Sequence, residues 1–292
     1  MRAAFPVLLL GLLGAFLAPG CGQGRKGPAR LAFSAIRDQD ATRLEARFDP
    51  VARYLAEALG VEVEYVPTSD YRASVEMFAN GDLQLAWFGG LTGVQARGLV
   101  PGARAIAMGE EDRAFRSYFI ANRDTGIERS KTFPLAMRGR TFTFGSESST
   151  SGRLMPEHFL RLYTGQGPEA FFSRVLFSGD HDQTAELVQA GAVEVGAINA
   201  LVYDRRVREG ETDPAICRVV WETPPYADYN FTAHPMLEAM FGPGFIDRLQ
   251  RALVAMDDPE LLAAFPRKRL VPASNEDFRG IEEVARTLHF LD

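Results

Sequence analysis

The sequence predicts an α/β protein made of two lobes with a ligand cleft between them. Strand-like and helix-like segments alternate along most of its 292 residues, which is typical of sheets covered by helices on both faces. A second series of alternating segments starts near Thr141 and follows the first. Hydrophobic residues make up 46% of the chain, which is enough for one large or two medium globular domains.

The N-terminus is expected to be a targeting segment. Arg2 gives a positive start, and the apolar run from Phe5 to Leu17 is too short to span a bilayer comfortably. The run Leu17-Ala18-Pro19-Gly20-Cys21 resembles a bacterial lipoprotein processing site, although Leu usually stands one residue nearer to Cys. We expect residues 1–20 to be a signal peptide and 21–29 a tether lipidated at Cys21, which places the protein in the periplasm or cell envelope. A plain signal peptide cut nearby is the alternative.

The first lobe is expected to span residues 30–122, and residues 224–292 are expected to return to it. Its strands are predicted where short apolar or alternating runs occur, at 31–35, 61–66, 83–88, 103–108 and 117–122. Its helices are predicted where apolar residues recur at helical spacing, at 43–59, 71–79, 91–97, 244–256 and 275–288. Gly60 and Asn80-Gly81 supply the stop signals for the first two helices.

The second lobe is expected to span residues 123–223. Its predicted strands are 141–144, 174–177, 193–199 and 218–222, and its predicted helices are 154–163, 183–190 and 201–207. Cys217 lies next to the last of these strands, so we expect a buried, inert thiol there.

Small hydroxyl residues gather at one strand-to-helix junction, in the run Ser148-Ser149-Thr150-Ser151-Gly152. The first turn of a helix has free backbone N–H groups and the positive end of the peptide dipoles. Hydroxyl donors at this point make a receptor for a tetrahedral oxyanion that needs no lysine. An ordinary N-cap is the alternative, because Ser and Thr favour that position. Two other strand ends, Phe88-Gly89-Gly90 and Ser178 to His181, are expected to face the same cleft.

Charge and motifs argue against several classes of function. The net charge is −6 and no basic stretch suggests nucleic-acid binding. Neither cysteine belongs to a metal-ligand spacing, and there is no Gly-x-Ser-x-Gly elbow. An exported hydrolase using a serine of 149–151 as nucleophile and His181 as base is therefore the weakest hypothesis. We expect a binding protein with no cofactor and no metal.

Five segments resemble the phosphonate/phosphite-binding proteins of ABC transporters. They are Tyr65 to Tyr71, Gly81 to Gly90, Ser149 to Gly152 with Leu154 and Pro156, Ser178 to His181, and Thr223 to Tyr229. The resemblance covers roughly residues 30 to 260, and the most similar subgroup is described as selenate-binding. It implies a type II periplasmic-binding-protein fold whose ligand contacts fall on Tyr71, Phe88, Gly89, Ser149, Thr150, Ser151 and His181. It also implies a monomer that serves an inner-membrane ABC permease; a sensor partnering a membrane histidine kinase is the alternative.

One departure from the family pattern bears on the ligand. Many members place Asp where this chain has Asn199. Asn can donate a hydrogen bond and does not repel a dianion. We therefore expect a fully ionised tetrahedral ligand such as selenate or sulfate, rather than an aminoalkylphosphonate. A structural role, in which Asn199 caps the following helix, is equally open.

Overall fold

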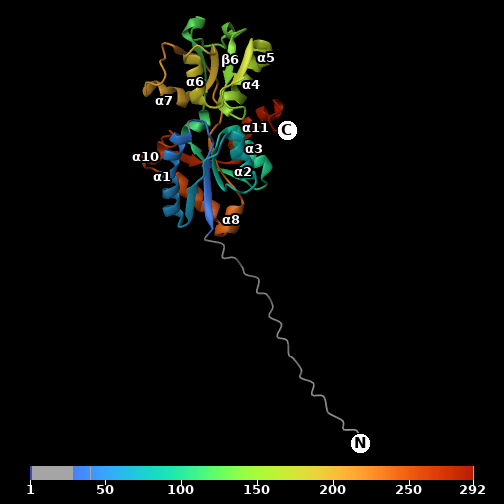
Figure 1. Cartoon of the computed structure of the whole chain (residues 1–292), viewed down its shortest axis with the longest axis vertical. Helices are drawn as coiled ribbons and strands as arrows, with labels where there is room; N and C mark the ends of the chain where they lie inside the picture. Colours follow the sequence, from blue (N-terminus) through green and yellow to red (C-terminus); the bar gives the residue numbers. More distant parts are fainter. Residues whose placement is uncertain (2–28, 40, 292) are drawn as a thin grey trace.

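The computed structural model describes residue 1 and residues 29–39 and 41–291. The predicted signal peptide from its second residue onward, the lipidation site Cys21 and most of the tether lie outside the described residues. Within the part that is described, no helix combines the length and the apolar character needed to cross a membrane. The described chain forms two α/β lobes stacked along the long axis of the molecule (Figure 1), as the sequence predicts.

The first lobe is built on a six-stranded mixed sheet with the strand order β11-β4-β10-β3-β1-β2. Its strands are β1 (Arg30–Ala35), β2 (Glu62–Tyr65), β3 (Leu85–Phe88), β4 (Arg104–Gly109), β10 (Asn230–Ala233) and β11 (Leu270–Pro272). The strands β1, β2 and β3 pair in parallel, whereas β10 runs antiparallel between β3 and β4. The carboxyl ends of β1 and β3 therefore meet at one edge, which faces the second lobe.

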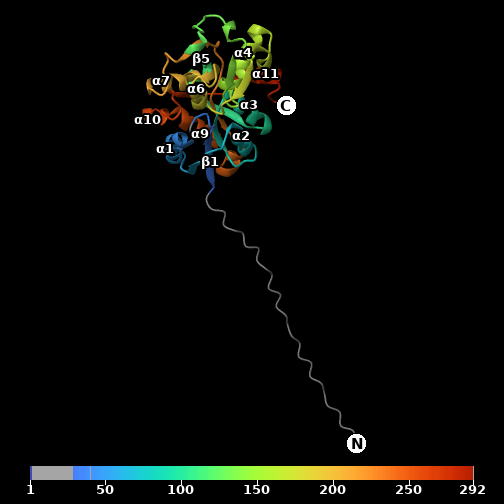
Figure 2. The same cartoon turned by 45° about the horizontal axis from the view of Figure 1, so that its top comes forward.

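Helices cover both faces of this sheet. They are α1 (Ala41–Leu59), α2 (Tyr71–Ala79), α3 (Gly90–Leu99), α8 (Met236–Phe241), α9 (Phe245–Val254), α10 (Pro259–Leu262) and α11 (Arg279–Thr287). Figures 1 and 2 both show α11 beside α3, so α11 packs on the first lobe. Short 3₁₀ turns lie at Glu110–Ala114 and Asn275–Phe278.

The second lobe contains a five-stranded sheet with the order β7-β6-β8-β5-β9. Its strands are β5 (Ser117–Asn122), β6 (Thr141–Phe144), β7 (Arg174–Phe177), β8 (Val195–Asn199) and β9 (Cys217–Glu222). Its helices are α4 (Met155–Thr164), α5 (Pro168–Phe171), α6 (His181–Gln189) and α7 (Ala200–Arg208), with 3₁₀ turns at Arg123–Thr125 and Leu135–Met137 and a π-helical turn at Thr150–Leu154. Cys217 is free and buried, as expected, and burial raises the pKa of its thiol to about 12.

The predicted lobe boundary at residue 122 is wrong by one strand. Ser117–Asn122 has the bounds that the sequence predicts, but it pairs with β8 and β9 in the second sheet rather than closing the first. The apolar pattern of a strand identifies the strand but carries no information on which sheet receives it. The chain therefore crosses between the lobes before Ser117, where Phe115 pairs with Tyr226 of the returning segment.

The two segments that cross between the lobes, at Phe115 and at Tyr226, pair with each other. The N–H of Phe115 donates to the carbonyl of Tyr226 at 2.8 Å, and the reverse bond is 3.0 Å long. The Ser117 hydroxyl lies 2.5 Å from the Tyr226 hydroxyl and donates to the carbonyl of Ser151 at 2.6 Å. The crossings thus contact the hydroxyl-rich run directly.

Candidate functional site: an anion receptor between the lobes

The hydroxyl-rich run lies between the end of β6 and the start of α4. Ser149 has extended backbone angles and its Oγ accepts the N–H of Gly152 at 2.9 Å, so it is the N-cap of the helix. The helix begins with the π-helical turn Thr150–Leu154 and continues as α4. The N–H groups of a first turn have no intrahelical carbonyl to bind, and π-helical turns are common at functional sites. Ser149 is therefore the N-cap of this helix, and the cap leaves the anion-receptor interpretation of the run open to the proposal below.

The three hydroxyl side chains are buried, and that of Thr150 contacts the other lobe. Ser149, Thr150 and Ser151 each expose 2% or less of their surface. The Oγ1 atom of Thr150 accepts the N–H of Leu91, in the first turn of α3, at 2.9 Å. The N-termini of two helices from different lobes thus meet at Thr150, which concentrates partial positive charge between the lobes.

His181 is fully buried at the start of α6 and lies against Ser151. Its Nδ1 accepts the backbone N–H of Asn199 at 3.4 Å, so the proton of the neutral ring sits on Nε2. Nε2 is 3.5 Å from the Ser151 hydroxyl. Burial lowers the pKa of His181 to about 4, so the ring is a neutral donor at neutral pH. A histidine with its proton on Nε2 cannot take the proton of Ser151, which removes the basis of the hydrolase hypothesis.

Tyr71 brings a phenol from the first lobe into the same space. It is the first residue of α2, whose N-cap is Asp70, and it is almost fully buried. Its hydroxyl faces the Ser149 side chain without reaching hydrogen-bond geometry and has no partner in the described part of the chain. Burial raises the pKa of Tyr71 well above its usual value, so the hydroxyl keeps its proton and remains a donor.

Of the two residues predicted at the β3–α3 turn, Gly89 reaches the site and the Phe88 side chain does not. A Cβ on Gly89 would lie 3.1 Å from Thr150 Oγ1, so a small residue is needed there. The Phe88 ring is fully buried and packs edge-on against Phe78 at 5.5 Å, inside the first lobe. Phe88 therefore supports the turn from the core and does not contact the anion space.

A buried carboxyl, Asp228, belongs to the site although the sequence did not single it out as a contact. Its Oδ1 accepts the N–H of Gly90 at 2.8 Å, and its Oδ2 has no hydrogen-bond partner among the described residues. Burial raises its carboxyl pKa to about 7, and the bond from Gly90 opposes this shift. The only sequence signal for Asp228 is its place in the segment Thr223 to Tyr229, which forms the second crossing.

Asn199 ends β8 and caps α7, as one of the two predicted interpretations requires. Its Oδ1 accepts the N–H groups of Leu201 and Val202 at 2.8 and 3.2 Å. Its Nδ2 donates to the hydroxyl of Tyr229 at 3.0 Å. Both ends of the amide are therefore engaged by the protein, and its influence on a ligand passes through its neighbours.

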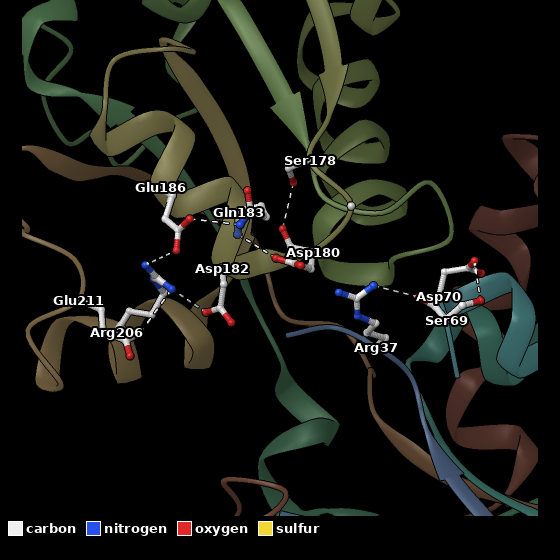
Figure 3. Close-up of a pocket in the computed structure, with 11 residues that line it drawn as sticks. Arg37, Ser69, Asp70, Ser178, Asp180, Asp182, Gln183, Glu186, Arg206 and Glu211 are labelled. Carbon is white, nitrogen blue, oxygen red and sulfur yellow. Dashed lines mark hydrogen bonds and ion pairs between the residues drawn. The ribbon is translucent and has the colours of Figure 1, made fainter. Parts of the chain in front are cut away.

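A cavity of about 700 Å³ opens between the lobes beside this cluster. Figure 3 shows Arg37 extending toward Ser69 on the first-lobe side and Arg206 facing Asp182 on the second-lobe side. The lining residues Asp180 and Asp182 flank His181 in sequence. None of Ser149, Thr150 and Ser151 lines the cavity, so it lies between the lobes outside the buried hydroxyl cluster.

The comparisons with known proteins agree with this geometry. A family model described as "ABC transporter, phosphonate, periplasmic substrate-binding protein" matches residues 33–278. The chain belongs to this family. It is 36% identical over 269 residues to a probable ABC transporter phosphite binding protein, PhnD1, of Prochlorococcus marinus, covering 90% of this chain and 91% of the relative. It is 30% identical over 236 residues to the phosphate-import protein PhnD of Mycolicibacterium smegmatis, covering 76% and 70% of the two chains.

The solved structures place this phosphonate-type binding protein in the type II periplasmic-binding-protein fold. The structure of P. marinus PhnD1 in complex with methylphosphonate matches with a TM-score of 0.85, covering 90% of this chain and 99% of that one. A binding component of a Pseudomonas aeruginosa phosphonate transporter matches with a TM-score of 0.76 at 18% identity, which supports the fold alone. The predicted family and fold are confirmed, and the chain is a substrate-binding component of an importer rather than an enzyme.

Arg153, the first charged residue of the anion-receptive helix, does not face the anion space or the solvent. Its guanidinium lies over the rings of Phe144 and Phe177, at 4.2 and 5.0 Å, and pairs with Glu157 at 2.7 Å. The Arg153 guanidinium is therefore engaged by Phe144, Phe177 and Glu157, and the polar groups around the hydroxyl run are neutral donors and helix termini.

Gly152 is the position where an added methyl group should disturb the site most directly. A Cβ there would lie 3.0 Å from both His181 Cε1 and Ser149 Oγ. We expect Gly152→Ala to weaken anion binding about tenfold, because overpacking a buried site costs roughly 1–3 kcal/mol. Titration calorimetry measures this, with Gly280→Ala on α11, where nothing lies within 4 Å of the added Cβ, as the matched control. Equal affinities for the two variants would contradict the assignment.

Proposed function

We propose that this protein captures a small phosphorus oxyanion, of the size of phosphite or methylphosphonate, between its lobes and delivers it to an ABC permease. Family membership supports the importer role. The identity of the ligand is inferred from the side chains that surround the interlobe space, together with the methylphosphonate named for the PhnD1 complex.

The observation that carries the proposal is a pair of buried polar atoms without partners among the described residues, one from the first lobe and one from the second crossing segment. The Tyr71 hydroxyl and the Asp228 Oδ2 are both buried and unpaired within the described chain, and both lie at the hydroxyl run. Buried polar groups are nearly always hydrogen-bonded, so such atoms indicate a missing partner. A donor and a carboxyl at the same place suit a ligand that both accepts and donates hydrogen bonds.

The carboxyl of Asp228 favours phosphite or phosphonate over sulfate or selenate. Phosphite and methylphosphonate can carry an acidic proton near neutral pH, and that proton can be shared with the free Oδ2. Sulfate and selenate have no proton to give at that pH, so an ionised Asp228 would repel them. The expectation of a fully ionised ligand rested on Asn199, whose amide is occupied by α7 and Tyr229. We therefore place selenate and sulfate second among the proposed ligands.

Two further parts of the proposal concern the partners. Lipidation of Cys21 would hold the protein at the membrane near its permease. The relatives that are 30% identical or more are named as binding or import proteins of transporters, which favours import over the sensor alternative. We also propose that the protein works as a monomer, because a binding protein presents one ligand at a time to its permease.

A calorimetric panel tests the ligand. Phosphite, methylphosphonate, 2-aminoethylphosphonate, inorganic phosphate, sulfate and selenate would each be titrated into the protein at pH 7. We expect one-to-one binding of phosphite or methylphosphonate, at least about 100-fold tighter than sulfate or selenate, which corresponds to roughly 3 kcal/mol. Tight binding of selenate or sulfate with no signal from either phosphorus anion would refute the proposal.

The same panel repeated against pH tests the role of Asp228. Below about pH 7 its carboxyl carries a proton and can donate to the anion; above that pH it is charged and repels it. Phosphite affinity should therefore fall as pH rises through 7, and Asp228→Asn should flatten that fall while improving sulfate binding relative to phosphite. Free phosphite titrates identically in both experiments. The ratio of the two proteins' phosphite affinities at each pH therefore reports the effect of Asp228 alone. Identical pH profiles would show that this carboxyl does not sense the ligand.

A further inference from the structure

The loop that follows β1 is joined to the second lobe through Asp38. Asp38 belongs to the first lobe and is 7% exposed. Its carbonyl accepts the N–H of His181, the first residue of α6, at 3.2 Å. Its carboxyl Oδ2 accepts the hydroxyl of Tyr229, on the second crossing, at 2.6 Å. A single residue thus contacts both the second lobe and the crossing segment.

The direction of every proton in this network can be assigned. The Tyr229 hydroxyl donates to the Asp38 carboxylate, so it accepts from Asn199 Nδ2 at 3.0 Å. Asn199 in turn donates its backbone N–H to Nδ1 of His181 at 3.4 Å. The bonds close a ring through Asp38, Tyr229, Asn199 and His181, which we call the Asp38 ring. None of these bonds uses Nε2 of His181, which is left to point at Ser151.

We propose that Asp38 is a positioning residue for anion binding: as the final acceptor of the Asp38 ring, it fixes the orientation of Tyr229 and Asn199, and through them the tautomer of His181. Asp38 acts through other residues rather than by binding the anion, because both of its carboxyl oxygens are already engaged by Tyr229 and Gln39. The idea rests on the proposed function, since it assigns Asp38 a role in that same site.

The proposal predicts that hydrogen-bond acceptance matters at position 38 and that negative charge does not. Asp38→Asn can still accept from Tyr229 through Oδ1, so it should bind phosphite within about threefold of the unmodified protein. Asp38→Ala and Tyr229→Phe should each lower the affinity about tenfold, the scale of one hydrogen bond. Because the two residues act as one unit, the double variant should lose no more than either single variant.

The chain offers a matched control. Tyr118 donates to Asp204 at 3.4 Å on the second lobe, away from the hydroxyl run. Tyr118→Phe removes a tyrosine–aspartate bond of the same kind and should leave phosphite affinity unchanged. Trp87 stacks on Tyr229 with ring centroids 5.6 Å apart, so tryptophan fluorescence reports whether the ring next to the network keeps its place in Tyr229→Phe.

A readout without any ligand separates this inference from the proposed function. Imidazole ¹⁵N chemical shifts at pH 7 should show His181 with its proton on Nε2, and a mixture of tautomers in Asp38→Ala; His181→Gln assigns the signal. If Asp38→Ala keeps a single tautomer and full phosphite affinity, the inference is overturned. If no phosphorus anion binds the unmodified protein but the tautomer still depends on Asp38, the proposed function fails while the Asp38 ring stands. The inference about Asp38 would also be overturned if the affinity losses of Asp38→Ala and Tyr229→Phe added up in the double variant.

Discussion

Replacing Thr150 with valine is expected to lower the affinity for phosphite by at least about 100-fold. The Thr150 hydroxyl is the one side chain of the run that bonds the opposite lobe, through the N–H of Leu91. Its loss removes a hydrogen bond to a charged ligand, about 1.5–3 kcal/mol, and leaves a buried N–H unpaired on closure, about 1–3 kcal/mol more. Valine has nearly the same shape, so the change is chemical rather than steric.

Calorimetric titration of phosphite against Thr150→Val gives the dissociation constant directly. Thr164→Val is the matched control, because Thr164 ends the same helix and its hydroxyl donates only to the local carbonyls of Leu160 and Gln166. We expect the control to bind within about threefold of the unmodified protein. A similarly small effect of Thr150→Val would show that the anion does not lie at the start of this helix.

The second large effect is expected on stability, from Asp112→Asn. Asp112 and Arg267 form a bidentate pair, with bonds of 2.6 and 2.8 Å, and both side chains are almost fully buried. Asp112 also accepts the N–H of Gly109 at 3.0 Å, and the Arg267 guanidinium lies 5.1 Å from the ring centre of Tyr229. Removing the negative partner leaves a buried arginine uncompensated, which costs about 3–5 kcal/mol.

Urea unfolding followed by circular dichroism measures this loss as a lower transition midpoint. Asp247→Asn supplies the comparison, since its pair with Arg104 has a similar distance of 2.7 Å but both partners are about half exposed. Exposed pairs contribute about 0–1 kcal/mol, so that variant should unfold almost like the unmodified protein. Equal destabilisation by the two variants would mean that the buried pair adds nothing beyond an ordinary surface pair.

The parts of the site that the sequence predicted are those encoded locally. Ser149, Thr150 and Ser151 stand together at a strand-to-helix junction, and a helix start has the same free N–H groups wherever it occurs. Tyr71 and His181 were found through the family resemblance, and the structure brings both to the hydroxyl run.

Other parts could not be predicted, because they depend on which segments meet in space. Asp228 reaches the anion space only because the second crossing passes the N-terminus of α3, where Gly90 binds it. Asp38 meets Tyr229 across 191 positions of sequence, and no local pattern connects them. The strand 117–122 was predicted with the correct bounds but assigned to the wrong sheet. The pattern of apolar residues in a strand does not show which strands it pairs with.

The electrostatics of the site follow from burial rather than from net charge. His181 is neutral, Tyr71 keeps its proton, and Asp228 has a pKa of about 7. Burial therefore leaves neutral donors near the carboxyl of Asp228, which can hold or release a proton near physiological pH. Such a site distinguishes oxyanions by their protonation as well as by their shape, which is the property that the ligand panel examines.

A crystal structure of the protein with methylphosphonate tests the central claim most directly. We expect the phosphorus atom between the lobes, with its oxygens within hydrogen-bond distance of Tyr71 Oη, the hydroxyls of Ser149, Thr150 and Ser151, and His181 Nε2. The free Oδ2 of Asp228 should face an oxygen of the ligand. Density for the anion on the outside of one lobe, or a cleft closed over these hydroxyls with no anion among them, would contradict the account.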